Sequence, residues 1–297
     1  DSLHNEAGAE KAFAAALASP DPKTRAAAAA GLRTVRAAEQ PLFLDVYGSP
    51  YYTSRFSNKL AYFQAQLGYK PEPDWPVSFY LGGRYAQDTR SRSGVAPEIY
   101  ADNVLAAGPG IRIQPPGWNA NLTAEEDGAL NLTRSASRPR DTEADGQVVL
   151  ADYGYWDGPV RTFADAGWSA GFYSRYRDNL IALLQLRAGG KVWDDQTSRL
   201  LLYAPFNVVK DRNRDFYNNL WEYGAGVEFQ PWINRNVKLR VEYLRGVYMG
   251  ITGVDPNPYG RVYNDLRVLL VFSGHFTAPP RSPDDDFQPT RARRISW

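Results

Sequence analysis

Residues 221–229, which read WEYGAGVEF, alternate between two kinds of side chain with a period of two. Trp221 and Val227 fall on one face of this segment, whereas Glu222 and Glu228 fall on the other. Because successive side chains of a β-strand point to opposite sides, the pattern predicts a strand with one apolar and one polar face. The same alternation recurs at 61–69, 77–85, 237–243 and 262–272.

About twelve such strands can be placed along the chain. Many are longer than the five or six residues usual in soluble sheets, and their length suits a strand that crosses a bilayer at a tilt. The segment 199–205 is the weakest of them. The predicted strands lie near 42–56, 59–70, 76–87, 103–113, 118–127, 147–157, 161–175, 179–189, 199–205, 216–229, 236–248 and 261–272.

The connections between these strands fall into two alternating sets. Every connection of ten or more residues belongs to one set, namely 88–102, 128–146, 206–215 and 249–260. Short turns at one end and long loops at the other are typical of outer-membrane barrels. We therefore predict an all-β fold, an antiparallel up-and-down transmembrane β-barrel of about 12 strands. An even number of strands places both termini in the periplasm.

The composition excludes several other classes of protein. The chain has 297 residues, with 34 Lys and Arg against 33 Asp and Glu, and the net charge of +1 predicts no nucleic-acid partner. There is no Cys and there are only two His, so thiol catalysis, Cys-based metal sites and multi-His sites are not expected. We predict no catalytic residue, no metal site and no cofactor. The longest apolar runs are too short for a transmembrane helix.

Aromatic residues are abundant, with 8 Trp, 19 Tyr and 13 Phe, and many lie near the ends of predicted strands. Amphipathic rings at both strand ends form the girdles of membrane barrels. A soluble β-domain with an aromatic core or sugar-binding platforms would also explain them. Glu126 fits the barrel poorly, because it falls on the apolar face unless a bulge shifts the register. The aromatic residues near strand ends are Tyr47, Tyr51, Tyr52, Tyr69, Trp75, Trp118, Tyr153, Tyr155, Trp156, Trp168, Tyr203, Trp232, Tyr248 and Tyr259.

The chain divides into three parts: 1–40, 41–276 and 277–297. The first part is rich in alanine and predicts two helices, with Asp21 as the N-cap of the second and Pro22 at its first position. This periplasmic pair resembles the end of a tetratricopeptide array, although an Ala-rich helix pair without repeat ancestry would look the same. The second part is the barrel, and the third is a Pro-rich, basic tail.

The polar faces of the strands are expected to line the lumen. Buried charges must be paired or hydrated, so the lumen is either a narrow wet channel or a polar core braced by salt bridges. Glu242 and Arg267 are expected to lie close enough to pair across neighbouring strands. The candidate lumen-lining residues are Arg84, Arg112, Asp165, Arg175, Arg187, Glu222, Glu228, Arg240, Glu242, Asp265 and Arg267.

Several segments together resemble the C-terminal barrel of phage-adsorption outer-membrane proteins, which is similar to the barrel of tetratricopeptide-containing exopolysaccharide exporters. These segments are YGSPYYTSRFSN at 47–58, GGRYAQDTRS at 82–91, IYADNVLAAGPGIR at 99–112, YNNLWEYGAGV at 217–227, VEYLRGVY at 241–248 and YNDLRVLLVF at 263–272. The resemblance implies a bacterial outer-membrane location and a role in polysaccharide passage or as a surface receptor. It supplies no catalytic residue. The short helix pair and the tail after the last strand depart from the family pattern.

We therefore expect a non-enzymatic barrel that passes a hydrophilic polymer such as an exopolysaccharide, passes a smaller solute, or anchors a cell-envelope assembly. The expected partners are outer-membrane lipid, polysaccharide, and periplasmic envelope proteins contacted through the helices and the tail. One alternative is a surface receptor or scaffold with a closed lumen. Others are a soluble glycan-binding β-domain and an outer-membrane enzyme, for which His275 has only Ser273 close in sequence.

Overall fold

A computed structural model provides the three-dimensional structure of the chain. It describes residues 6–38, 40–72, 75–90, 103–115, 120–133, 140–195, 198–231, 236–249, 257 and 259–277. The predicted tail beyond Thr277 and most of the predicted connections 88–102 and 249–260 lie outside the described residues.

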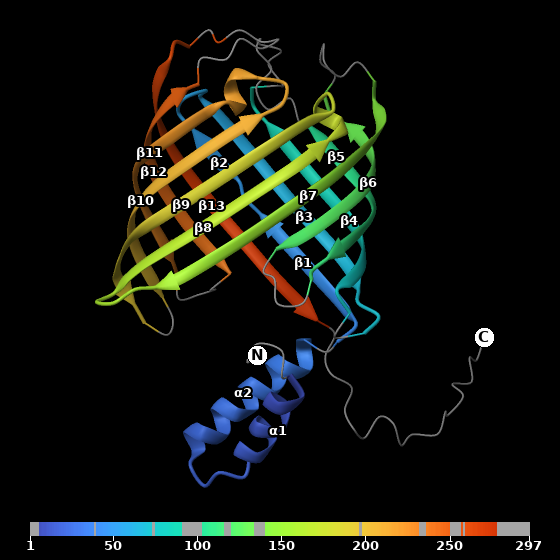
Figure 1. Cartoon of the computed structure of the whole chain (residues 1–297), viewed down its shortest axis with the longest axis vertical. Coiled ribbons are helices and arrows are strands. Elements are labelled where there is room, and N and C mark those ends of the chain that lie inside the picture. Colours follow the sequence, from blue (N-terminus) through green and yellow to red (C-terminus); the bar gives the residue numbers. More distant parts are fainter. Residues whose placement is uncertain are drawn as a thin grey trace, which may run out of the picture.

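The described residues form a closed antiparallel barrel with strongly tilted strands, below which lies a pair of helices (Figure 1). Each strand pairs with its neighbours in sequence, so the topology is up-and-down. The strands are β1 Leu42–Gly48, β2 Tyr51–Thr53, β3 Asn58–Tyr69, β4 Val77–Asp88, β5 Val104–Ile113, β6 Asn121–Asn131, β7 Thr142–Asp157, β8 Thr162–Tyr173, β9 Asn179–Asp194, β10 Arg199–Asp211, β11 Leu220–Gln230, β12 Val237–Tyr248 and β13 Val262–Thr277.

Segments β1 and β2 are two pieces of one barrel strand. Both pair with β3 on one side and with β13 on the other, and Pro50 lies between them. Counted in this way, the thirteen segments of the described chain make twelve barrel strands, which confirms the predicted fold and strand number. Phe43, near the start of the first strand, pairs with Thr277, at the end of the last strand, so the two ends of the barrel sequence lie at the same mouth. We call this end the terminal mouth and the opposite end the loop mouth.

The outer face of the barrel is apolar. Outward side chains such as Leu67, Leu81, Leu105 and Val148 remain 45–60% exposed. The inward positions of the same strands carry many of the buried charged and amide side chains. A soluble β-domain has the reverse arrangement, with its apolar faces packed inside, so this distribution contradicts the alternative of a soluble glycan-binding domain.

Several strands extend further than the sequence predicts. The weak strand 199–205 is the first half of β10, which continues through Pro205 to Asp211. Strand β6 ends at Asn131 and strand β7 begins at Thr142. The connection between them is therefore much shorter than the predicted 128–146. These extensions contain Asp and Asn residues that indicate loops in a sequence but form the polar inner face here.

The aromatic residues at strand ends divide between the two faces. Tyr69, Trp75 and Trp156 are exposed and suit a membrane girdle, but Tyr203 and Tyr248 are buried in the lumen. Proximity to a strand end does not determine the face, because neighbouring residues point to opposite sides. Part of the predicted girdle is therefore wrong, and Trp118 and Trp232 lie outside the described residues.

Glu126 faces outward, as the sequence pattern indicates. It lies opposite Gly146, and β6 keeps one register with β7 over the described length of their pairing. A bulge therefore does not remove this carboxylate from the apolar face. Acidic side chains on the lipid face of a barrel cost less than basic ones, which is consistent with the presence of Glu126 there.

The helix pair consists of α1 Glu6–Ala16 and α2 Pro22–Ala38. Asp21 caps α2 as predicted, because its carboxylate accepts hydrogen bonds at 3.1 Å from the backbone N–H groups of Lys23 and Thr24. These bonds, together with a stronger one from the Thr24 hydroxyl, hold the pKa of Asp21 below its usual range. Neither of the described helices is long and apolar enough to cross a membrane.

Candidate functional site in the lumen

The barrel lumen collects the charged residues that the sequence predicts on the inner wall. All of them point inward in the structure, although Arg175 lies in a short 3-10 turn, η2 Ser174–Tyr176, rather than in a strand. They are distributed over separate groups at different depths. Each group is described below with the residues that sequence analysis missed.

The first group lies near the loop mouth, and we call it the loop-side network. Glu222 is 1% exposed, and its carboxylate accepts hydrogen bonds from both terminal nitrogens of Arg267 and, at 2.6 Å, from the Tyr263 hydroxyl. Asp265 is fully buried and accepts from Arg267 Nε at 2.7 Å and from the Thr53 hydroxyl at 2.8 Å. These bonds join β2, β11 and β13 across the inside of the barrel.

Arg55 extends this network toward the loop mouth. Its Nη1 lies 3.6 Å from Glu222 Oε1, and its guanidinium lies 3.9 Å from the centroid of the Phe56 ring. Phe56 belongs to a buried cluster that sequence analysis did not identify. The cluster consists of Phe56, Phe216, Leu220, Tyr248 and Tyr263, with Phe216 in the short turn η3 Phe216–Asn218.

The second group lies nearer the terminal mouth, and we call it the terminal-side network. Arg187 donates two hydrogen bonds to Asp165, at 2.9 and 2.6 Å, and a third to Glu228 at 2.8 Å. Glu228 also accepts from Arg240 Nε at 2.6 Å. Asp165 and Arg187 are direct cross-strand partners, as are Glu228 and Arg240. The long side chain of Arg187 joins the two pairs across β10.

Glu242 and Arg267 are directly opposite on β12 and β13, as the sequence predicts. Their side chains nevertheless bind different groups. Glu242 accepts a 2.8 Å hydrogen bond from the Tyr203 hydroxyl, whereas Arg267 binds Glu222 and Asp265. The expected cross-strand pair is therefore replaced by contacts that skip one strand, with Tyr203 and Glu222, and by a contact with Asp265 along the same strand.

The remaining predicted residues have separate partners. Arg112 binds Asp45 at 2.8 Å near the terminal mouth. Arg175 binds Asp145 at 2.8 Å and donates to the Asn131 amide oxygen at 2.7 Å, near the loop mouth.

Arg84 lies between Arg112, near the terminal mouth, and Arg175, near the loop mouth. Its Nη1 donates to the Gln147 side chain at 3.1 Å, and its Nη2 lies 3.5 Å from Asp127.

A rim of buried Asn and Asp side chains at the loop mouth was missed by sequence analysis. Asn58 accepts hydrogen bonds from the backbone of Thr89 and Arg90, and Asn179 donates to Asp211 at 2.8 Å. These side chains fix the chain where it leaves each strand. Their signal in the sequence is an Asn or Asp at each of these strand ends. The rim residues are Asn58, Asp88, Asn103, Asn131, Asn179, Asp211, Asp215 and Asn219.

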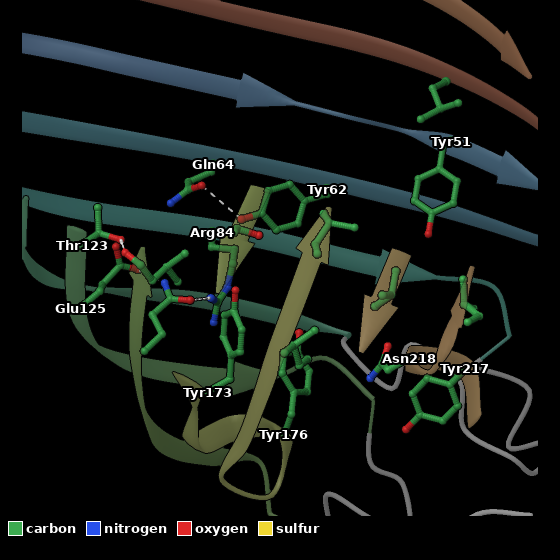
Figure 2. Close-up of a pocket in the computed structure, with 18 of the residues that line it drawn as sticks. Tyr51, Tyr62, Gln64, Arg84, Thr123, Glu125, Tyr173, Tyr176, Tyr217 and Asn218 are labelled. Atoms are coloured by element: carbon green, nitrogen blue, oxygen red, sulfur yellow. Dashed lines mark hydrogen bonds between the residues drawn. The ribbon is translucent and has the colours of Figure 1, made fainter. Parts of the chain in front are cut away.

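A cavity of about 700 Å³ lies within the lumen (Figure 2). It reaches the loop-side network through Arg55, Glu222 and Arg267, but its lining includes none of the terminal-side network. Tyrosines contribute much of its wall, with Tyr51, Tyr62, Tyr173, Tyr176 and Tyr217 labelled in the figure. The volume is in the range of sites for small molecules, about 300–1,000 Å³.

The lumen presents groups that can bind a polar solute. Phenol, amide, guanidinium and carboxylate groups provide donors and acceptors for a polar solute. Among the described residues, no group of three or more His, Asp or Glu side chains is arranged to hold a metal ion. His275 contacts Asp45 and stacks on Phe43 near the terminal mouth.

Comparisons with known proteins find structural similarity to other barrels but show no family for the chain. No protein-family model matches the sequence, and no curated protein matches it. The structure is similar to a bacterial polysaccharide outer membrane secretin, with 12% identity over 80% of this chain and 99% of that chain and a TM-score of 0.45.

Two further similarities are weaker. The KdgM porin in complex with disordered oligogalacturonate has 7% identity over 78% of this chain and 99% of that chain, with a TM-score of 0.32. An outer membrane channel from Pseudomonas putida F1 has 12% identity over 80% of this chain and 96% of that chain, with a TM-score of 0.34. These values transfer neither a substrate nor an activity, so any function has to be argued from the lumen itself.

Proposed function

We propose that this protein is a bacterial outer-membrane barrel that passes a small hydrophilic solute through a narrow, braced lumen. One observation carries the proposal: a solute-sized cavity of about 700 Å³ lies on the loop side of a network in which Arg187 joins Asp165 to Glu228. A polar cavity gives a solute somewhere to bind, and the network restricts the path beyond it. The apolar outer face supports a membrane location.

The finer expectations stay predictions. Passage of an exopolysaccharide would require the terminal-side network to open wide enough for a continuous polymer. A receptor or scaffold with a closed lumen would need the cavity to have no route to the terminal mouth. The resemblance to phage-adsorption and exporter barrels also stays a prediction. So does contact of the helices or the tail with envelope proteins.

Orientation gives the first test. We propose that both termini are periplasmic, so that the loop mouth faces the cell exterior. A cysteine at Arg212, which is exposed in the β10–β11 connection, should react with an impermeant maleimide on intact cells. A cysteine at Val160, which is 94% exposed in the β7–β8 turn, should react only after lysis. The opposite labelling pattern would invert the proposed topology, and labelling of both on intact cells would argue against a membrane barrel.

Conductance in planar bilayers tests the passage itself. The wild-type barrel should conduct weakly, because the terminal-side network narrows the lumen. Glu228→Gln removes the carboxylate that binds both Arg187 and Arg240. The conductance should rise because the network is weakened, and the barrel should become more selective for anions because a negative charge is lost from its lumen.

Glu126→Gln provides the matched control, because it removes the same charge from the outer face. It should leave conductance and ion selectivity unchanged. A large steady conductance of the wild type, or no change in either quantity for Glu228→Gln, would contradict the proposed narrow passage.

A further inference from the structure

The cavity in the lumen has two walls of different chemistry. One wall, formed by β4, β6 and β7, carries Arg84 and Glu125 (Figure 2). Gln147 on β7 belongs to the same wall. The other, formed by β9 and β10, carries Ile181, Leu183 and Val209. Leu183 and Val209 are direct cross-strand partners, so they form a continuous apolar strip that faces inward. A solute that is polar throughout would leave this strip exposed to water.

The polar wall contains an excess of carboxylates. Glu125 and Asp127 point inward from the same strand, and Asp145 lies directly opposite Asp127 on β7. All three are at least nine-tenths buried, with exposures of 6%, 2% and 5%. Like charges in directly opposite positions of a sheet destabilise it, and burial makes this repulsion stronger.

The described cations do not balance these carboxylates. Arg84 is the cation recorded beside Asp127, at 3.5 Å, and it lies on the same wall as Glu125. Arg175 is shared between Asp145 and Glu143. The three buried carboxylates of this wall, Glu125, Asp127 and Asp145, thus outnumber the two arginines recorded beside them, Arg84 and Arg175, among the residues that the structure describes.

Hydrogen bonding leaves the same carboxylates only partly satisfied. No well-directed hydrogen bond reaches either oxygen of Asp127 or Oε2 of Glu125 within the described structure, although the two carboxyl groups lie close enough to share a proton and the Tyr80 hydroxyl lies beside Glu125. The other oxygen of Glu125 accepts from Gln147 at 3.0 Å. Buried acceptors without a well-directed donor carry part of the cost of desolvation, so a donor supplied by a bound molecule would stabilise them.

A small cavity next to these groups shares part of its lining with the main one. Its volume is about 10 Å³, close to the space that one water-sized group occupies, and its wall includes Asp127 and Asp145. It shares Arg84, Gln147 and Tyr173 with the lining of the main cavity. A compact donor could enter this space while the rest of its molecule remained in the larger one.

We propose that the lumen binds a small organic cation that has a primary ammonium group and an apolar body. The ammonium group has three donors and one positive charge, which match the partly satisfied oxygens of Glu125 and Asp127 and the excess of carboxylates on their wall. The apolar body covers Ile181, Leu183 and Val209. The inference rests on the proposed function and narrows it, because the solute that passes would be charged and hydrophilic at its ammonium end and apolar at the other end.

Calorimetric titration of the full-length barrel in lipid nanodiscs tests the inference, with empty nanodiscs as the blank. The probe is 4-phenylbutylammonium, and 4-phenylbutanol and butylammonium are the comparison compounds. The wild type should bind the probe at least ten times more tightly than either comparison compound. Glu125→Gln and Asp127→Asn should each weaken binding of the probe at least tenfold, and Leu183→Ser should weaken the probe but not butylammonium.

Glu126→Gln is the matched control, because it lies between the two carboxylates in sequence but faces outward. It should bind the probe as the wild type does. Absence of probe binding, equal binding of 4-phenylbutanol, or unchanged binding by folded Glu125→Gln would each overturn the inference. Failure of the conductance test alone would leave this binding intact, so the two proposals can fail separately.

Discussion

Glu222→Gln is expected to destabilise the folded barrel by about 3–5 kcal/mol, because it removes one partner of a buried ion pair. Glu222 is 1% exposed and binds Arg267 and Tyr263, with Arg55 3.6 Å away. The substitution leaves the two guanidinium groups with Asp265 as the remaining carboxylate of the network. Chemical denaturation in detergent micelles, followed by tryptophan fluorescence, measures the change in the free energy of unfolding.

Glu242→Gln is the control for this measurement. Glu242 is also buried and inward-facing, but the hydrogen bond recorded for it is the one from the Tyr203 hydroxyl. Its replacement should therefore cost at most about 1 kcal/mol, the usual contribution of a single hydrogen bond, because the Gln amide oxygen can still accept from Tyr203. Equal effects of the two substitutions would mean that the loop-side network does not brace the barrel.

Val148→Arg is expected to cost about 2–4 kcal/mol, because it places a charge on the lipid face near the middle of β7. Val148 is 45% exposed on the outer face. Its neighbour Val149 faces inward and lines the cavity, so Val149→Arg makes the same replacement at the same depth in a polar environment. The free energy of unfolding in lipid vesicles should fall much less for Val149→Arg, and equal losses would show that the two faces have been assigned wrongly.

The face of each strand could be predicted from the sequence, because burial in a barrel follows a strict period of two. This is why Glu222, Glu228, Asp265 and Arg267 were expected on the inner wall. The extent of β10 could not be predicted, because Pro205 and Asn207 both indicate the end of a strand. A barrel tolerates them, because neighbouring strands on both sides hold the segment in place.

The partners of the inner charges could not be predicted from the same pattern. Glu242 faces Arg267 in the register, but each binds a different group. Arg187 reaches Glu228 across an intervening strand. Periodicity predicts the face to which a side chain points, but not how far along the wall it extends. Contacts that skip a strand therefore require the three-dimensional structure.

The cavity and its partly satisfied carboxylates were missed for a related reason. Glu125 and Asp127 look like ordinary inward-facing acids in the sequence, and Asp145 lies in a segment that reads as a loop. Their proximity depends on the register between β6 and β7. A shift of one residue would turn Asp145 to the lipid face and remove the site.

The pairing of β1 with β13 also has a consequence for how the barrel forms. Phe43 and Thr277 are adjacent in the wall although they stand at opposite ends of the barrel sequence. Every other seam joins strands that are neighbours in the chain and can form by local hairpin growth. Contacts between distant parts of a chain form slowly, because they require the largest loss of chain entropy. Closure of this one seam should therefore be the slowest step of folding, and its rate should set how long an open sheet with two unpaired edges persists.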